Sequence, residues 1–147
     1  MSKWLVVVAL CLSVAACGGV DPDSPLGKRQ TAFKSMLKVS EELGGMLRGR
    51  VPYDEARFIA GAAELQQLSR EPWQYFPEVR DDERSQATDE VWKRQAQFRE
   101  IADELQKETA DLLAATATPP LSRSHLKPLL QRIEDSCERC HQAFRAY

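Results

Sequence analysis

The last eleven residues of the chain contain the pattern Cys137-x-x-Cys140-His141. Cys-x-x-Cys-His is the pattern at which a c-type haem is attached covalently. The two thiols bind the haem, and the adjacent histidine takes one axial position on the iron. Residues at positions i, i+3 and i+4 of a helix share one face, so a helix presents all three side chains together. We therefore predict one haem c per chain, attached at Cys137 and Cys140, with His141 as axial iron ligand.

Two other uses of this motif fit the sequence less well. A structural zinc ion needs about four ligands. The other histidine, His125, lies 16 residues before His141, which is roughly 24 Å along a continuous helix. A redox-active thiol pair needs a helix N-terminus, where the helix dipole lowers the thiol pKa. Here the motif ends a helical pattern, so haem attachment is the favoured interpretation and the other two remain alternatives.

The start of the chain has the composition of a bacterial export signal. Lys3 precedes an apolar run that ends at Ala16 and is too short to span a bilayer. The sequence Val-Ala-Ala-Cys ending at Cys17 resembles the lipobox, in which the cysteine is lipidated; ordinary cleavage after Ala16 is the alternative. We predict a signal peptide over residues 1–16 and a lipidated tether over residues 17–25. By resemblance to Gram-negative lipoproteins, the glycines after Cys17 favour the periplasmic face of the outer membrane.

Composition sets limits on what the rest of the chain can do. Residues 26–147 are long enough for one domain with a hydrophobic core. The net charge of the chain is −2 and no stripe of basic residues occurs, so we expect no nucleic-acid partner. The only two cysteines of this domain belong to the Cys-x-x-Cys-His motif, which leaves none for a structural disulfide.

Four amphipathic segments predict an all-α domain, and no strand pattern occurs. We predict the first helix over Leu26–Leu47, and the second after Val51 with Pro52 in its first turn. The stretch Arg70–Ala87 contains two prolines and three aromatic residues without a helical period. It is therefore predicted to be a long crossover between the second and third helices.

The third and fourth helices complete the predicted domain. Thr88 is the predicted N-cap of the third helix, along which apolar residues recur every seven positions: Val91, Phe98, Leu105 and Leu112. Ser122 or Ser124 caps the fourth helix, and Pro128 favours the later start. The prediction is an antiparallel four-helix bundle with the haem near its C-terminal helix.

A residue on the other face of the iron must come from another helix or be absent, because few residues follow the motif. In an antiparallel bundle, the start of the first helix, Lys28–Met36, can lie beside the end of the fourth. Met36 could be a sixth ligand, since Met/His ligation is typical of electron-transfer haem. It could equally fill the core at helical spacing.

The chain resembles the cytochrome c′ family over nearly all of its length after the tether. The resemblance rests on Arg29-Gln30 followed by Phe33 and Met36, on the aromatic stretch Glu71–Phe76, on Trp92, and on the C-terminal motif followed by Phe144-Arg145. It implies a five-coordinate haem whose open distal face is covered by an apolar side chain, and Phe33 falls at that position. It also implies a homodimer, often built on the first two helices.

The resemblance further assigns roles around the haem. Arg29 and Gln30 fall where the family contacts a haem propionate, and Gln86 falls where the loop touches the haem edge. Gln86 departs from the acidic residue of some relatives. Arg145 falls on the proximal side, where the family suggests that it holds a proximal ligand or tunes the histidine.

We accordingly expect a periplasmic haem protein that binds NO, and CO, at an open iron site and is not an enzyme. A six-coordinate electron carrier with Met36 as sixth ligand is the main alternative. An enzyme that reduces NO or peroxide is the least favoured reading, because the sequence places no distal His and Arg pair for peroxide cleavage.

Overall fold

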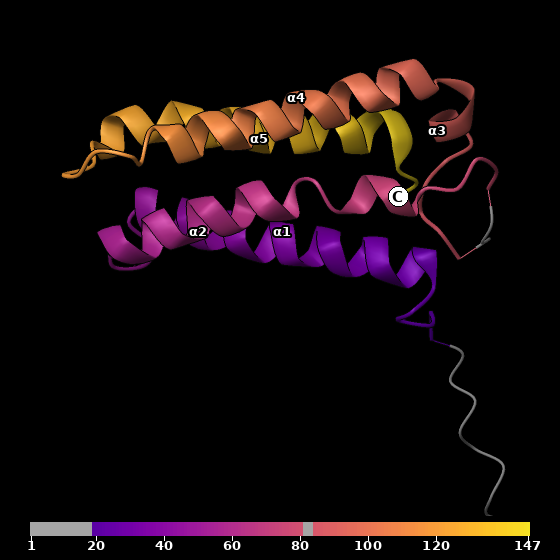
Figure 1. Cartoon of the computed structure of the whole chain (residues 1–147), viewed down its shortest axis with the longest axis horizontal. Helices are drawn as coiled ribbons and strands as arrows, with labels where there is room; N and C mark the ends of the chain where they lie inside the picture. The colour runs from indigo at the N-terminus through magenta and orange to yellow at the C-terminus, as the bar shows by residue number, and fades with distance from the viewer. Residues whose placement is uncertain (1–18, 81–83) are drawn as a thin grey trace, which may run out of the picture.

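The computed structural model describes residues 19–80 and 84–147, and these residues form helices joined by loops (Figure 1). The elements in chain order are α1 (Pro25–Leu47), α2 (Glu55–Leu68), the 3-10 helix η2 (Pro72–Tyr75), α3 (Glu90–Lys93), α4 (Gln95–Ala114) and α5 (Arg123–Phe144). The predicted signal peptide and Cys17 lie outside the described residues. No helix in the described ranges is long and apolar enough to cross a membrane.

The four long helices form two antiparallel pairs that pack face to face (Figure 1). One pair is α1 with α2 and the other is α4 with α5, and between the pairs α1 packs against α5 and α2 against α4. This arrangement confirms the predicted four-helix bundle with a long crossover. The start of α1, the crossover and the end of α5 lie together at one end of the bundle (Figure 1).

The core follows the apolar faces that the sequence predicts. All four residues of the seven-residue spacing, Val91, Phe98, Leu105 and Leu112, are at most 9% exposed. Helices bury such faces because transfer of apolar surface out of water supplies about 25 cal/mol per Å². The main core cluster joins α1, α2, α4 and α5, and a second cluster of Val91, Phe98 and Phe144 lies by the end of α5.

The starts of the second and fourth helices differ from the favoured predictions. The second helix begins at Glu55 and not at Pro52, because the carboxylate of Asp54 accepts a hydrogen bond from the Arg57 amide and caps it. The fourth helix has the earlier of the two proposed caps, since the Ser122 hydroxyl accepts from the His125 amide. Pro128 is accommodated inside this helix.

The third predicted helix does not start with Thr88 as its cap and is divided in two. The Thr88 hydroxyl makes no hydrogen bond to the helix, so it does not cap it. The Thr88 amide donates to the Phe144 carbonyl at 2.9 Å and so ties this residue to the end of α5. The helix is interrupted at Arg94, whose φ of −120° and ψ of 47° are not helical. The Arg94 guanidinium donates to the Ala143 carbonyl and lies over the Phe144 ring. The break therefore lets this side chain hold the end of α5.

Candidate functional site

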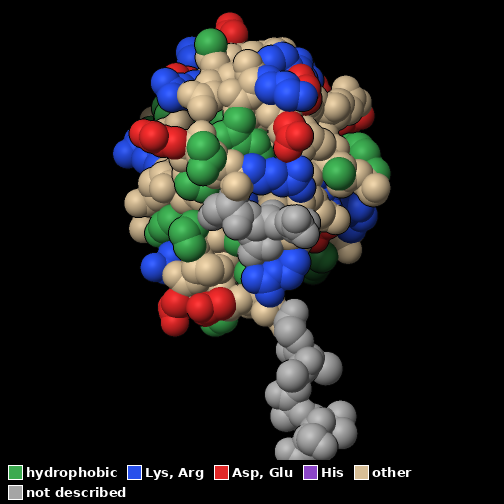
Figure 2. Space-filling model, turned by 90° about the vertical axis from the view of Figure 1, so that its right-hand side faces the viewer, with side chains coloured by type: hydrophobic (Ala, Val, Ile, Leu, Met, Phe, Trp, Pro, Cys, Tyr) green, Lys and Arg blue, Asp and Glu red, His purple; other side chains and the backbone are tan. Residues whose placement is uncertain are grey.

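A cavity of about 720 Å³ lies at the end of the bundle where α1, the crossover and α5 meet. Its volume is within the range of about 300–1,000 Å³ that is typical of cofactor sites. Most of its lining surface is apolar, and most of the lining residues belong to α1, α5 and the crossover. On the outer surface of this end, basic and acidic side chains are interspersed with hydrophobic ones (Figure 2). The predicted site residues that line the cavity are Arg29, Gln30, Phe33, Met36, Gln86, Cys137, Cys140, His141 and Arg145.

The Cys-x-x-Cys-His motif lies in the last two turns of α5, and all three of its side chains line the cavity. The two thiols are free. Burial raises the pKa of Cys137 to about 11, helped by the neighbouring charges, and burial alone raises that of Cys140 to about 11. Both sulfurs are therefore protonated at neutral pH, unlike the low-pKa thiols of redox-active pairs.

His141 is half-buried at the same place. Burial lowers its pKa, and the nearby charge of Arg145 lowers it further. Both effects favour the neutral imidazole, which is the form that ligates metals. The end of α5 therefore offers one nitrogen ligand flanked by two thiols.

This set of donors fits a haem better than a bare metal ion. A zinc or similar ion needs several ligands of its own, and within residues 19–80 and 84–147 no three His, Cys, Asp or Glu side chains are placed to share one. A covalently attached haem needs only one histidine on iron, because the thiols bind its periphery. The residues present and the large apolar cavity fit that group.

Phe33 and Met36 bring the first turns of α1 to the same cavity. The ring of Phe33 is partly buried and makes edge-to-face contacts with Trp73 at 5.7 Å and Phe76 at 6.4 Å between centroids. Met36 is 5% exposed and also belongs to the main core cluster. The crossover therefore supplies the aromatic partners that hold Phe33.

Arg29 is only 2% exposed and connects α1 to the crossover. Its guanidinium donates to the Tyr75 carbonyl at 2.8 Å and to the Ser85 hydroxyl at 3.1 Å. It also lies over the Phe76 ring, 4.7 Å from its centroid. Arg29 lines the cavity, as the predicted propionate contact requires, and it also fixes the path of the crossover above it.

The crossover meets the C-terminal segment on the other side of the cavity. Gln86 and Arg145 are joined by two side-chain hydrogen bonds, and an antiparallel bridge pairs Ala87 with Arg145. Gln86 lines the cavity, and its side chain is directed to Arg145. The sequence gives no sign of this contact, because the two residues are 59 positions apart.

Sequence reasoning missed Ser85 as a site residue. It is 8% exposed, accepts from Arg29 and lines the cavity. A single serine in a polar loop carries no periodic or motif signal that could have identified it. Val91 and Phe98 were predicted only as core, yet they form part of the cavity wall. Their seven-residue spacing shows that they face inward but not that the interior is hollow there.

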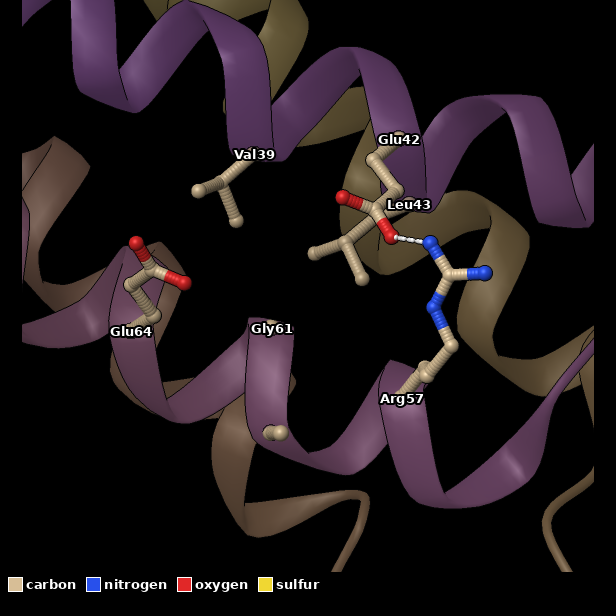
Figure 3. A pocket seen from close by; sticks show the side chains of 7 residues that line it. Val39, Glu42, Leu43, Arg57, Gly61 and Glu64 are labelled. Carbon is tan, nitrogen blue, oxygen red and sulfur yellow. Dashed lines mark hydrogen bonds and ion pairs between the residues drawn. The ribbon is translucent and has the colours of Figure 1, made fainter.

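A smaller hollow of about 190 Å³ lies between α1 and α2, away from the motif (Figure 3). Val39 and Leu43 line it from α1, and Gly61 from α2. An ion pair between Glu42 and Arg57 closes one side. It contains no histidine or cysteine, so its residues suggest a packing surface and not a chemical site.

The chain is similar to known proteins over almost the whole of the described bundle. The family model described as "Cytochrome C'" matches residues 24–145. A cytochrome c' from Alcaligenes xylosoxydans xylosoxydans is 28% identical over 124 residues, which cover 84% of this chain and 94% of that protein. The structure of cytochrome c prime from Shewanella frigidimarina has a TM-score of 0.80 at 25% identity, covering 88% of this chain and 99% of that one.

Two further similar structures contain diatomic ligands. One is a nitric oxide complex of a variant of cytochrome c prime from Alcaligenes xylosoxidans, with 26% identity, a TM-score of 0.77 and coverage of 88% of this chain and 98% of that one. The other is a carbon monoxide-bound variant of the same protein, with 26% identity, a TM-score of 0.77 and coverage of 87% and 98%.

Proposed function

Because the chain belongs to the cytochrome c′ family, we propose that it binds nitric oxide and carbon monoxide at the iron of one covalently attached haem c. The family is one of non-enzymatic haem proteins, and membership implies covalent haem c. Cys137 and Cys140 would hold the haem, and His141 would be the only protein ligand of the iron. The biological role that follows is capture of nitric oxide as protection against it.

The observation that carries this proposal is the common cavity lined by the α5 motif and by Phe33 of α1. When bound, the haem supplies an iron with one open coordination position. The Phe33 side chain has no lone pair for iron. With the haem in place, this ring would exclude water from the iron and would have to move for a diatomic ligand to enter. Arg29 and Gln30 are the residues proposed to meet the haem propionates, since guanidinium pairs well with carboxylate.

An optical spectrum of the purified ferrous protein tests the proposal. A high-spin spectrum that changes when CO is added is the expected result. A low-spin spectrum that CO does not alter would reject an open iron site. A colourless protein, after expression in a host that attaches c-type haem, would reject the haem itself.

The second candidate function is electron transfer with Met36 as sixth iron ligand. It is favoured by one observation, namely that Met36 lines the same cavity as His141. In that case the wild-type spectrum is low-spin, and Met36→Ala converts it to high-spin. A low-spin spectrum that persists in Met36→Ala would assign the sixth position to a different residue.

For the location we propose a lipid anchor on Cys17 that holds the bundle at the periplasmic face of the outer membrane. The support is the lipobox-like sequence before Cys17 and the polar stretch that follows it. Two or more acyl chains give stable anchoring. Cys17→Ser should block processing or release the protein as a soluble form. A correctly processed variant that stays on the membrane would contradict the anchor.

We also propose that the protein forms a homodimer through α1 and α2. The shallow hollow between these helices is lined by Val39 and Leu43 of α1 and by Ala60 and Gly61 of α2 (Figure 3). Ala60, an exposed residue of α2 at this hollow, offers a direct test. Ala60→Arg should shift the sedimentation of the protein from dimer to monomer, while Ala96→Arg on the exposed face of α4 should not. If the Ala60→Arg protein still sediments as a dimer, this face is not the dimer interface.

A further inference from the structure

The last residues of the crossover, 85–88, bridge the two sides of the cavity. On one side, the Ser85 hydroxyl accepts from Arg29 of α1. On the other side, this segment pairs with the residues at the end of α5. The Thr88 amide donates to the Phe144 carbonyl at 2.9 Å, and the Ala146 amide donates to the Gln86 carbonyl at 2.7 Å. The backbone here is thus fixed from both sides.

The side chain of Gln86 adds a specific contact to this backbone pairing. Its amide oxygen accepts from two nitrogens of the same guanidinium, Nε of Arg145 at 3.1 Å and Nη2 at 2.8 Å. Because both nitrogens belong to one planar guanidinium, the two hydrogen bonds fix the orientation of the guanidinium plane as well as its distance from Gln86. Arg145 is otherwise an exposed residue at the end of a helix. Without Gln86 its long side chain would regain rotamer freedom.

Arg145 is held close to the proposed iron ligand. Its amide donates to the His141 carbonyl at 3.0 Å, and both side chains line the cavity. Gln86 is neutral, so it holds the guanidinium without cancelling its positive charge. A carboxylate at this position could hold the same fork but would neutralise it.

We propose that Gln86 is a positioning residue, which holds the charge of Arg145 beside His141 and thereby raises the reduction potential of the haem. The inference rests on the proposed function. Its physical basis is that reduction removes one positive charge from the iron, so a fixed cation nearby favours the reduced form. A cation that moves into water is screened and contributes less.

A double-mutant cycle on the haem-bearing protein tests this role. Gln86→Ala should lower the equilibrium constant for reduction about threefold, which is about 30 mV at 59 mV per tenfold change. Arg145→Gln should lower it at least as much. In the Arg145→Gln background, Gln86→Ala should have no further effect. An unchanged potential in the single variant, or an equal drop in both backgrounds, would overturn the inference.

Two additional measurements separate this inference from the proposed function. Gln131→Ala, which removes an exposed glutamine of α5 that pairs with Asp135, should leave the potential unchanged. Hydrogen exchange of the Arg145 Nε–H, followed by NMR on the haem-bearing protein, reports on this contact without measuring the potential. It should be slow in the wild-type protein and at least about tenfold faster in Gln86→Ala, while Gln86→Glu should keep it slow. If the Arg145 Nε–H exchanges at the same rate in wild type and Gln86→Ala, Gln86 does not position Arg145, even if CO binding is normal.

Discussion

The two ends of the bundle are built differently. At the end away from the motif, aliphatic side chains and Phe58 fill the interior, and Leu43, Met46, Leu112, Leu126 and Leu130 are each at most 1% exposed. At the motif end, aromatic rings and polar groups surround a cavity of about 720 Å³. Protein interiors are normally close-packed. The hollow end is therefore the part of the molecule whose packing depends on a further group.

The ends also differ in what holds them together. At the filled end, helix packing and the short connection between α1 and α2 dominate, and a long-range hydrogen bond from the Leu121 amide to Glu55 adds to them. At the cavity end, long-range contacts hold the crossover and the end of α5 in place, such as those of Arg29 with Tyr75 and of Arg94 with Ala143. The comparison teaches that local helix patterns specify the filled end, while the site depends on loop residues that are distant in sequence.

The largest effect should come from removing the haem attachment. In a protein with both Cys137→Ser and Cys140→Ser, we expect complete loss of haem absorbance from the denatured polypeptide, because no thiol remains to bind it. Amides at the cavity end should then exchange hydrogen faster, and those around Leu112 and Leu130 should change little. His125→Ala, which alters the other histidine, should keep its haem. If amide hydrogen exchange became faster by the same factor at both ends, the stability of the filled end would also depend on the haem.

The second effect concerns stability at the filled end. Leu130 is 1% exposed on α5, eleven residues before His141, or roughly 16 Å along the helix. Leu130→Ala should lower the free energy of unfolding by about 2–5 kcal/mol, because it leaves a cavity in a packed core. Urea denaturation measures this. The rate of CO binding should stay within about twofold of wild type; a larger change would mean that packing at one end controls the other.

The filled end could be predicted from the sequence to a large extent. The seven-residue spacing identified Leu105 and Leu112 there, and both are buried. Helical periodicity works here because each residue's environment is decided by the helix face on which it lies. The motif was equally predictable, because its three residues act within two turns of one helix.

The contacts around the cavity could not be predicted in the same way. Thr88 has the residue type of an N-cap, yet its hydroxyl makes no hydrogen bond, while its amide donates to the carbonyl of Phe144, 56 positions later. The pairing of Gln86 with Arg145 likewise depends on where the crossover runs. Such contacts follow from tertiary structure, and local propensity is only a weak prior for them.

The third effect concerns entry to the cavity. Phe33→Ala should speed CO binding by about tenfold, because the ring no longer has to leave its contacts with Trp73 and Phe76. Aromatic contacts of this kind are worth about 0.5–1.5 kcal/mol each, and about 1.4 kcal/mol corresponds to a tenfold change in rate. Flash photolysis of the CO complex measures the rate. The rate for Phe33→Leu should lie between those of wild type and Phe33→Ala. Lys38→Ala, on the exposed face of α1, should bind CO at the wild-type rate. An unchanged rate would remove Phe33 from the ligand path.

The smallest effect should come from a buried acid between α4 and α5. Glu108 is 7% exposed, and its Oε2 atom has no hydrogen-bond partner. Burial raises its pKa and the charge of Glu104 raises it further, while Arg139 and the Ser136 hydroxyl act in the opposite direction. Burying an unsatisfied polar group costs about 1–3 kcal/mol. Glu108→Gln should therefore stabilise the protein at neutral pH by about 1 kcal/mol in urea denaturation.

The pH dependence of the stability gained in Glu108→Gln distinguishes the loss of a buried charge from a change in side-chain packing. A carboxyl group whose folded-state pKa is raised contributes full stability below its unfolded value, about 4.3, and loses that contribution as the pH rises through the folded value. The difference between Glu108→Gln and wild type should therefore be small at pH 4 and grow toward pH 7. Glu100→Gln, on the exposed face of the same helix, should show neither effect. A gain that is equal at both pH values would mean that the shape of the new side chain, and not the loss of a buried charge, stabilises the interface between α4 and α5.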